Sequence, residues 1–270
     1  MNSDRIRIAA VGDLHCAKAM TPGTLSAVLA QVSERADVLA LCGDLTDTGT
    51  ADEAKSLVRE LAVAKVPIVA VLGNHDYESD KADEVKRILS DGGVSVLDGD
   101  SVEIRGVGFA GVKGFAGGFG ERALQSWGEP ILKQFVREAV EEALKLEGAL
   151  ARLRTAHRIA LLHYSPVRAT VTDEPSEIAA FLGSSRLEDP LNRYPVTAAF
   201  HGHAHRGSLE GRTSSGVPVY NVALPLLRRR FPNEPGFRVV EVQVERTTNG
   251  GAPSAPVPVH AGAGIGATIP

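Results

Sequence analysis

The sequence has 270 residues, of which 43% are hydrophobic and 23% are charged, and its net charge is −4 at neutral pH. This length and composition predict one large globular domain with a substantial core. The slightly acidic balance argues against a dedicated nucleic-acid binder, which usually presents a basic face.

Short apolar runs rich in Val, Ile and Ala predict strands that are buried on both faces. Five such runs lie at residues 6–11, 38–42, 66–72, 158–162 and 196–200. Between the first three, apolar residues recur at helical spacing at 25–32 and 57–61. Thr50 and Glu53 predict a capping box at the start of the second helix. This alternation of strand and helix predicts parallel βαβ units in an α/β fold.

The second half of the chain contains longer segments. Residues 111–120 are rich in Gly and Phe and predict a mobile loop, and residues 130–155 form the longest helical pattern. Residues 237–244 alternate as a strand does. From residue 247 the chain is mostly Gly, Ala, Pro and Ser, which cannot bury enough apolar surface to offset ordering. We therefore expect a single domain at 1–246 and a disordered tail at 247–270.

The cysteine content and the N-terminus bear on the compartment. Cys16 and Cys42 are the only cysteines, so a disulfide framework does not hold the fold and a reducing compartment is expected. Both are interpreted as small packed side chains. Residues 1–7 are polar, and no segment approaches the roughly 20 apolar residues that span a bilayer. These features predict a cytoplasmic protein without a membrane partner.

Each predicted strand is followed at once by side chains that can bind a metal. The segments are GDLH at 12–15, GDLT at 43–46, GNHD at 73–76, His163, and GHAH at 202–205. In an open parallel sheet the carboxyl ends of the strands meet at one crevice, so these side chains are expected to converge. Residues two apart in an extended backbone face the same side, which applies to Asp13 and His15 and again to His203 and His205. Any one segment alone is typical of a surface turn, but the ordered set indicates a metal or catalytic site.

This ordered set resembles the calcineurin-like metallophosphoesterase superfamily, whose pattern is Asp-x-His, Gly-Asp, Gly-Asn-His-Asp or Glu, His, and Gly-His-x-His. The resemblance spans residues 6–206. It implies a four-layer α/β/β/α sandwich, in which helices flank two mixed β-sheets and a dinuclear metal site lies on the rim. It also implies that Asp44 bridges the two metals. The remaining ligands would be Asp13, His15 and His205 for one metal, and Asn74, His163 and His203 for the other.

The same resemblance implies two catalytic roles. His75 would lie beside the leaving group, and Asp76 would orient the ring of His75. A hydroxide shared by the two metals would act as the nucleophile. Mixed oxygen and nitrogen ligands favour Mn, Fe or Zn over Ca or Mg, which prefer shells of oxygen atoms alone.

Other polar residues lie near these motifs in the sequence. Arg186, Asn192 and Arg193 are candidate substrate contacts in the segment after the fourth strand. The basic run 228–230 is either a solvated turn or a contact for a substrate phosphate. His201 either supports a neighbouring ligand or packs within its strand.

The motifs favour a dinuclear metal-dependent hydrolase, a phosphatase or phosphodiesterase, that acts on a small phosphate mono- or diester. A nuclease is the first alternative, but it usually needs a basic groove or an added nucleic-acid domain, and the sequence indicates neither. A non-catalytic scaffold of the same fold is the second alternative. Such a scaffold typically lacks ligands or the histidine at position 75, whereas all of them are present here.

Overall fold

The computed structural model describes residues 3–18 and 20–245. The first part of the chain alternates regularly between strand and helix. Its elements are β1 (Ser3–Val11), α1 (Ser26–Arg35), β2 (Val38–Cys42), α2 (Ala51–Leu61), β3 (Ile68–Val71), α3 (Ala82–Asp91) and β4 (Val94–Val96). The rest comprises β5 (Asp100–Ile104), β6 (Val107–Gly111), α4 (Pro130–Arg152), β7 (His157–Leu161), α5 (Glu188–Arg193), β8 (Ala198–His201), β9 (Glu210–Arg212), β10 (Pro218–Asn221), α6 (Leu224–Arg230) and β11 (Arg238–Glu245).

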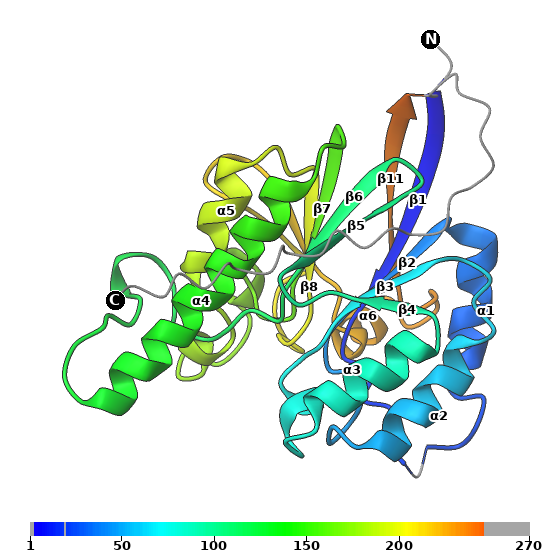
Figure 1. Ribbon diagram of the computed structural model, residues 1–270, viewed down its shortest axis with the longest axis horizontal. Coiled ribbons are helices and arrows are strands. Elements are labelled where there is room, and N and C mark those ends of the chain that lie inside the picture. The colour runs from blue at the N-terminus through cyan, green and yellow to red at the C-terminus, as the bar shows by residue number, and fades with distance from the viewer. Residues whose placement is uncertain (1–2, 19, 246–270) are drawn as a thin grey trace, which may run out of the picture.

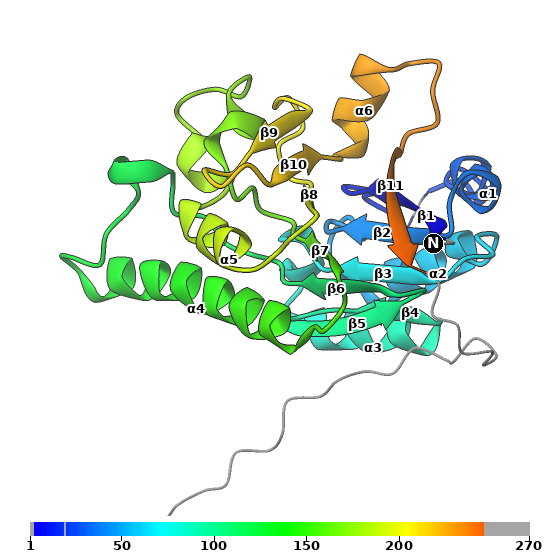
Figure 2. The same ribbon diagram turned by 90° about the horizontal axis from the view of Figure 1, so that it is seen from above.

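The strands form two mixed sheets. The first has the order β11-β1-β2-β3-β4, in which only β11 runs antiparallel to its neighbour. The second has the order β5-β6-β7-β8-β10-β9, with antiparallel strands at both edges. Helices α1 to α3 cover one side and α4 and α5 the other, as Figures 1 and 2 show. The expected four-layer α/β/β/α sandwich is confirmed.

Three apolar layers hold these elements together. Ile8, Phe109 and Phe200 are fully buried between the two sheets. Leu57 of α2 belongs to the core on the outer side of the first sheet, and Leu146 of α4 to the core outside the second. Each such side chain stabilises the fold by about 1.5–3 kcal/mol through burial. These layers fix the positions of the strand ends that carry the site.

Carboxylates of α2 determine where two helices begin. The expected capping box is present, because Thr50 caps the backbone of Glu53 and the Glu53 side chain accepts a hydrogen bond from the Thr50 amide at 3.1 Å. Glu60, near the other end of α2, accepts hydrogen bonds from the amides of Leu25 and Ser26 at the start of α1. The two helices are thereby tied to each other by polar contacts as well as by packing.

Some elements differ from the sequence-based expectation. The short strands β4, β5 and β6 were not predicted, and the turn between β5 and β6 uses positive φ at both Arg105 and Gly106. Residues 111–120, expected to be a mobile loop, are held by hydrogen bonds from the Gly117 amide to the Ala180 carbonyl and from the Gly118 amide to the Gly183 carbonyl.

Two expectations concern the ends of the chain and the membrane. The predicted tail at 247–270 lies outside the described residues. Among the described helices, none combines the length and the apolar character needed to cross a bilayer.

Candidate metal centre

The five motif-bearing strands end at one rim, but they do not form a single open sheet as the motif spacing suggested. Strands β1, β2 and β3 belong to the first sheet, and β7 and β8 to the second. Hydrogen bonds join the two sheets at this rim. The Gly12 amide after β1 donates to the Val222 carbonyl after β10, and Nδ1 of His163 after β7 bonds to the carbonyl of Cys42 in β2. The candidate ligands therefore converge between the ends of two sheets.

The backbone of the candidate ligands is tightly turned. Asp13, His15, Asp44 and His203 all have positive φ, at 56°, 44°, 46° and 68°. The expectation that alternation along an extended strand aligns Asp13 with His15 is therefore wrong. Left-handed backbone costs a non-glycine residue of order 1 kcal/mol, and such strain concentrates at functional sites. The left-handed turns, and not the alternation of side chains along a strand, orient these side chains toward the rim.

Two glycines let the ligand segments approach one another. A Cβ atom at Gly73 would overlap the backbone nitrogen and the carboxylate of Asp44. A Cβ atom at Gly202 would overlap the carboxylate of Asp13. Any side chain at these positions would push the two carboxylates away from the rim.

Asp44 lies between two clusters of candidate ligands and is buried. Its Oδ1 is 3.3 Å from Nε2 of His163, and its Oδ2 is 3.9 Å from Nε2 of His15. The Oδ1 atom also accepts the backbone amide of His75 at 2.9 Å. The two oxygens of one carboxylate thus face two different histidines, as a bridging ligand requires.

The first cluster consists of Asp13, His15 and His205, whose ligand atoms lie within 4.8 Å of one another. Oδ1 of Asp13 is 2.9 Å from Nε2 of His205, and both Asp13 oxygens accept the amide of His203. Burial raises the pKa of Asp13 to about 6, although the hydrogen bond with His205 opposes this shift. The hydrogen bond to Asp13 in turn raises the pKa of His205.

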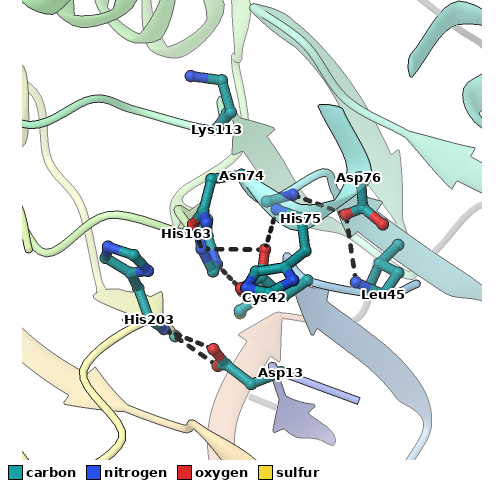
Figure 3. Close-up of polar contacts among 12 residues, drawn as sticks. Asp13, Cys42, Leu45, Asn74, His75, Asp76, Lys113, His163 and His203 are labelled. Carbon is teal, nitrogen blue, oxygen red and sulfur yellow. Dashed lines mark hydrogen bonds and ion pairs between the residues drawn. The ribbon is translucent and has the colours of Figure 1, made fainter. Parts of the chain in front are cut away.

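The second cluster consists of Asp44, His163 and His203, again with ligand atoms within 4.8 Å of one another. Oδ1 of Asn74 is 2.8 Å from Nε2 of His163, so the amide joins this cluster (Figure 3). Nε2 of His203 bonds to the carbonyl of Phe181 at 3.2 Å. Burial lowers the pKa of His203 to about 3 and that of His163 well below its ordinary value. Both rings are therefore neutral at pH 7 and can bind a metal through a lone pair.

The polar atoms around His163 fit a bound cation. Because a carbonyl oxygen can only accept, Nδ1 of His163 donates to Cys42, and Nε2 of the neutral ring then carries a lone pair. That lone pair faces two acceptors, Oδ1 of Asn74 and Oδ1 of Asp44. A cation among these three atoms would turn a repulsive contact into a coordination shell.

The surroundings of His15 also fit a bound cation. Its Nε2 atom is buried and has no hydrogen-bond partner in the described part of the chain. An unpaired buried nitrogen costs about 1–3 kcal/mol, so it needs a function that the protein groups do not supply. Because this atom belongs to the cluster of Asp13 and faces Asp44, a metal ligand is the role that fits.

His75 lies beside the two clusters and is half-buried. Its Nδ1 donates to the backbone carbonyl of Asp47 at 2.7 Å, and its ring packs edge-on against His15. Burial alone would lower the pKa of His75, but the Asp47 carbonyl and the carboxylates of Asp44 and Glu78 raise it overall. The ring is thus favoured to carry a proton beside the metal ligands.

Asp76 does not hold the His75 ring, contrary to the expectation. Its carboxylate accepts hydrogen bonds from the amides of Gly73 at 2.8 Å, Thr46 at 2.8 Å and Leu45 at 3.2 Å, and from the Thr46 hydroxyl at 2.6 Å. Figure 3 shows the contacts with the two backbone segments. Asp76 is fully buried, and this burial raises its pKa to about 6. The side chain therefore ties the loop of Asp44 to the loop that carries His75.

Asp47 and Lys113 line this region and were not singled out in the sequence. Asp47 supplies the carbonyl for His75, and its Oδ1 is 3.5 Å from Nδ1 of His15. The only sequence signal for it is its place three residues after Asp44. The carbonyl of Lys113 accepts the amides of both His163 and Tyr164, while its side chain points away from these histidines (Figure 3).

The candidate substrate contacts are used elsewhere in the structure. Arg186 donates to the carbonyl of Leu124, Asn192 bonds to the Ser214 hydroxyl, and Arg193 pairs with Glu147 of α4. These contacts connect loops and helices around α5. None of the three partners belongs to the two ligand clusters.

Two further sequence features can now be placed. His201 is buried and bonded at both ring nitrogens, to the Thr170 hydroxyl at 2.8 Å and to the Gly202 carbonyl at 2.7 Å. It supports the loop that follows β8. In the basic run, Arg229 donates to the carbonyl of His205 and Arg230 pairs with Asp173.

Comparison with known proteins agrees with this geometry. The family model described as calcineurin-like phosphoesterase matches residues 6–207. No curated protein matches the sequence significantly.

Two solved structures illustrate the likeness in fold. Phosphopantetheinyl hydrolase from Mycobacterium tuberculosis superposes with a TM-score of 0.61 at 17% identity, over 86% of this chain and 95% of that chain. Purple acid phosphatase PPD1 from yellow lupin superposes with a TM-score of 0.52 at 16% identity, over 83% of this chain and 44% of that chain. At such identities the likeness concerns the fold alone. The family match, which covers most of the chain and contains every motif of the rim, shows that the protein belongs to the calcineurin-like phosphoesterase family.

Proposed function

We propose that this protein is a dinuclear metal-dependent hydrolase of a small phosphate mono- or diester. The position of Asp44 is the observation that supports the proposal most directly. One carboxylate oxygen faces His163 of the second cluster and the other faces His15 of the first, so a single side chain lies between the two clusters. A mononuclear site would not need this arrangement.

The chain's own residues would divide between two cations. Asp13, His15 and His205 would hold one, and Asn74, His163 and His203 would hold the other, with Asp44 between them. The mixture of imidazole nitrogens with carboxylate and amide oxygens suits Mn, Fe or Zn. When bound, two such cations neutralise the charge of a phosphate ester and lower the pKa of water.

His75 would act on the leaving group. In hydrolysis the oxygen of water forms a bond to phosphorus, the ester P–O bond breaks, and the departing alkoxide takes up a proton. The contact of Nδ1 with the Asp47 carbonyl leaves Nε2 as the ring atom that can deliver this proton. Against the opposing effect of burial, the Asp47 carbonyl and the carboxylates of Asp44 and Glu78 raise the pKa of His75 and so favour the protonated ring.

The net charge of −4 favours a small substrate over a polynucleotide, because a nuclease must hold a chain of phosphates. The names of the structural neighbours, a hydrolase and a phosphatase, accord with a phosphoester substrate. The cytoplasm remains the expected location.

The decisive experiment combines metal analysis with a substrate panel. The full chain would be loaded with Mn and offered p-nitrophenyl phosphate, bis(p-nitrophenyl) phosphate, cyclic nucleotides and single-stranded DNA. We expect two metals per chain and hydrolysis of a small ester. The variant Asp44→Asn should lose metal and activity together, whereas Asp91→Asn on the exposed surface of α3 should keep both. Two bound metals without hydrolysis of any phosphoester would contradict the proposal and favour a scaffold.

A further inference from the structure

A cavity of about 460 Å³ lies beside the first turns of α4. The segment that leads into this helix loops out next to it, as Figure 1 shows. The apolar residues that line the cavity are Leu124, Ile131, Leu132, Phe135, Ala180 and Phe181. Its volume is in the range of sites that take small organic molecules.

The wall of this cavity offers few groups for hydrogen bonding. Arg122, which is exposed, is the only charged side chain among the lining residues. The carbonyl of Ala180 is already taken by the amide of Gly117 at 2.9 Å. A nucleobase or a sugar placed here would lose its bonds to water without replacing them, which costs about 1–3 kcal/mol for each unpaired group. The wall therefore favours an alkyl or aryl group.

One residue of the cavity wall contacts a candidate metal ligand. Phe181 lines the cavity, and its backbone carbonyl bonds to Nε2 of His203 at 3.2 Å. A second connection runs through aromatic rings. The ring centroid of Phe135, in the cavity wall, lies 4.9 Å from that of Phe115. The centroid of Phe115 lies 6.0 Å from that of Tyr164, which in turn lies 4.5 Å from that of His203.

Two large apolar side chains of this wall are exposed to solvent, which is unfavourable while no ligand covers them. Ile131 is 73% exposed and Phe181 is 59% exposed. Large apolar side chains gathered around one cavity commonly mark a binding site. A ligand that covers them would release water from apolar surface, which is a favourable contribution to binding.

We propose that this cavity binds the organic part of the phosphoester, and that this part is a hydrophobic alkyl or aryl group. The inference rests on the proposed function, because the metal centre would hold the phosphate while the cavity holds the remainder of the molecule. It assigns a structural purpose to the segment rich in Gly and Phe before α4. Gly117 lines the cavity, and Phe115 connects it to the metal ligands.

The test uses n-alkylphosphonates, which carry the anionic group but cannot be hydrolysed. Methyl- to octylphosphonate would be titrated into the full chain loaded with Mn, and the dissociation constant measured by calorimetry. Each added methylene should tighten binding about fourfold until the cavity is filled, in line with the free energy of burying a CH₂ group.

Two substitutions on α4 compare a residue that lines the cavity with one elsewhere on the surface of the helix. Leu132→Gln places an amide in the cavity and should abolish the dependence on chain length while leaving the affinity for methylphosphonate unchanged. Leu144→Gln, at a residue of the same helix that is 58% exposed and is not among the lining residues, should bind the series as the unaltered protein does. Phe181→Ser, at an exposed lining residue, provides a second test if Leu132→Gln fails to fold.

The outcomes distinguish this inference from the proposed function. Equal affinity for methyl- and octylphosphonate would overturn the cavity assignment and leave the metal centre as proposed. A steep dependence on chain length that Leu132→Gln and Phe181→Ser do not alter would also overturn it. A steep dependence that both variants abolish, in a protein that hydrolyses no phosphoester, would support the cavity and contradict the proposed reaction.

Discussion

The carbonyl of Asp47 accepts a hydrogen bond from Nδ1 of His75 at 2.7 Å. A carbonyl has no proton to give, so this contact fixes the proton of the neutral ring on Nδ1, and Nε2 is the nitrogen that takes up the second proton when the ring is cationic. Asp47 comes three residues after Asp44, which places the support for His75 on the same loop as the candidate bridging ligand. One segment thereby holds the ring of His75 and carries the candidate bridging ligand.

Because the Asp47 carbonyl holds the His75 ring, we expect the role of His75 in turnover to be separable from metal binding. His75→Ala should lower turnover by about 10²- to 10⁴-fold, the usual effect of removing a general acid, because no other group would protonate the leaving oxygen. Its metal content should stay at the level of the unaltered protein, since His75 is in neither the cluster of Asp13 nor that of Asp44; it lies near His15 and Asp47 in a third group of possible ligands, where its Nδ1 is bonded to the Asp47 carbonyl. Steady-state kinetics and elemental analysis would measure both. His157→Ala, at the start of β7, is the control, and full turnover in His75→Ala with both metals bound would contradict the assignment.

Metal uptake should depend on pH through Asp13. Burial raises the pKa of its carboxyl to about 6, so protons compete with a cation for this group at a higher pH than for an exposed aspartate. The affinity of the stripped protein for Mn should therefore fall as the pH drops through about 6, and because the raised pKa of His205 adds a second competing proton, the affinity should already begin to fall above pH 6.5. Equilibrium dialysis between pH 5 and pH 8 would measure this. An affinity that does not change over this range would show that Asp13 and His205 do not hold a metal together.

Asp76 should matter for stability more than for proton transfer. Asp76→Ala would leave the buried amides of Leu45, Thr46 and Gly73 without their acceptor. Each such group costs about 1–3 kcal/mol, so the free energy of unfolding should drop by about 3 kcal/mol or more. Urea denaturation would measure the loss against Asp91→Ala as the control. A variant as stable as the control but slow in turnover would restore the original expectation that Asp76 orients His75.

The strands and the candidate ligands could be predicted because their signals are local. An apolar run followed by glycine and a polar ligand is visible within eight residues, as at β1 with Asp13 and at β2 with Asp44. The resemblance to a family added the division of ligands between two metals. Neither signal required knowledge of how the sheets pack.

The remaining features depend on contacts between distant segments, which no local pattern encodes. Two partners of Asp76, Leu45 and Thr46, come from a loop some thirty residues earlier. The alternation argument for Asp13 and His15 failed because both residues adopt left-handed turns. The cavity beside α4 joins Gly117 to Phe181 across more than sixty residues of sequence.

The capping of α1 by Glu60 predicts a pH-dependent contribution to stability. Burial alone would raise the pKa of this carboxyl, but the hydrogen bonds from Gly23 and Ser26 lower it overall. In the unfolded chain a glutamate titrates at about 4.3. Because the folded pKa is below that value, the stabilisation is fully present above about pH 4.5 and is lost as the pH falls through the folded pKa.

Glu60→Gln should therefore lower the free energy of unfolding at pH 7 by about 1–3 kcal/mol, since a neutral amide accepts the bonds from Gly23, Leu25 and Ser26 less strongly than a carboxylate does. The difference from the unaltered protein should shrink as the pH falls below about 4, because the native carboxyl then becomes neutral as well. Urea denaturation at several pH values would measure it, with Glu141→Gln on the exposed face of α4 as the control. A difference that stays constant from pH 7 to pH 3 would mean that the charge of Glu60 does not stabilise the start of α1.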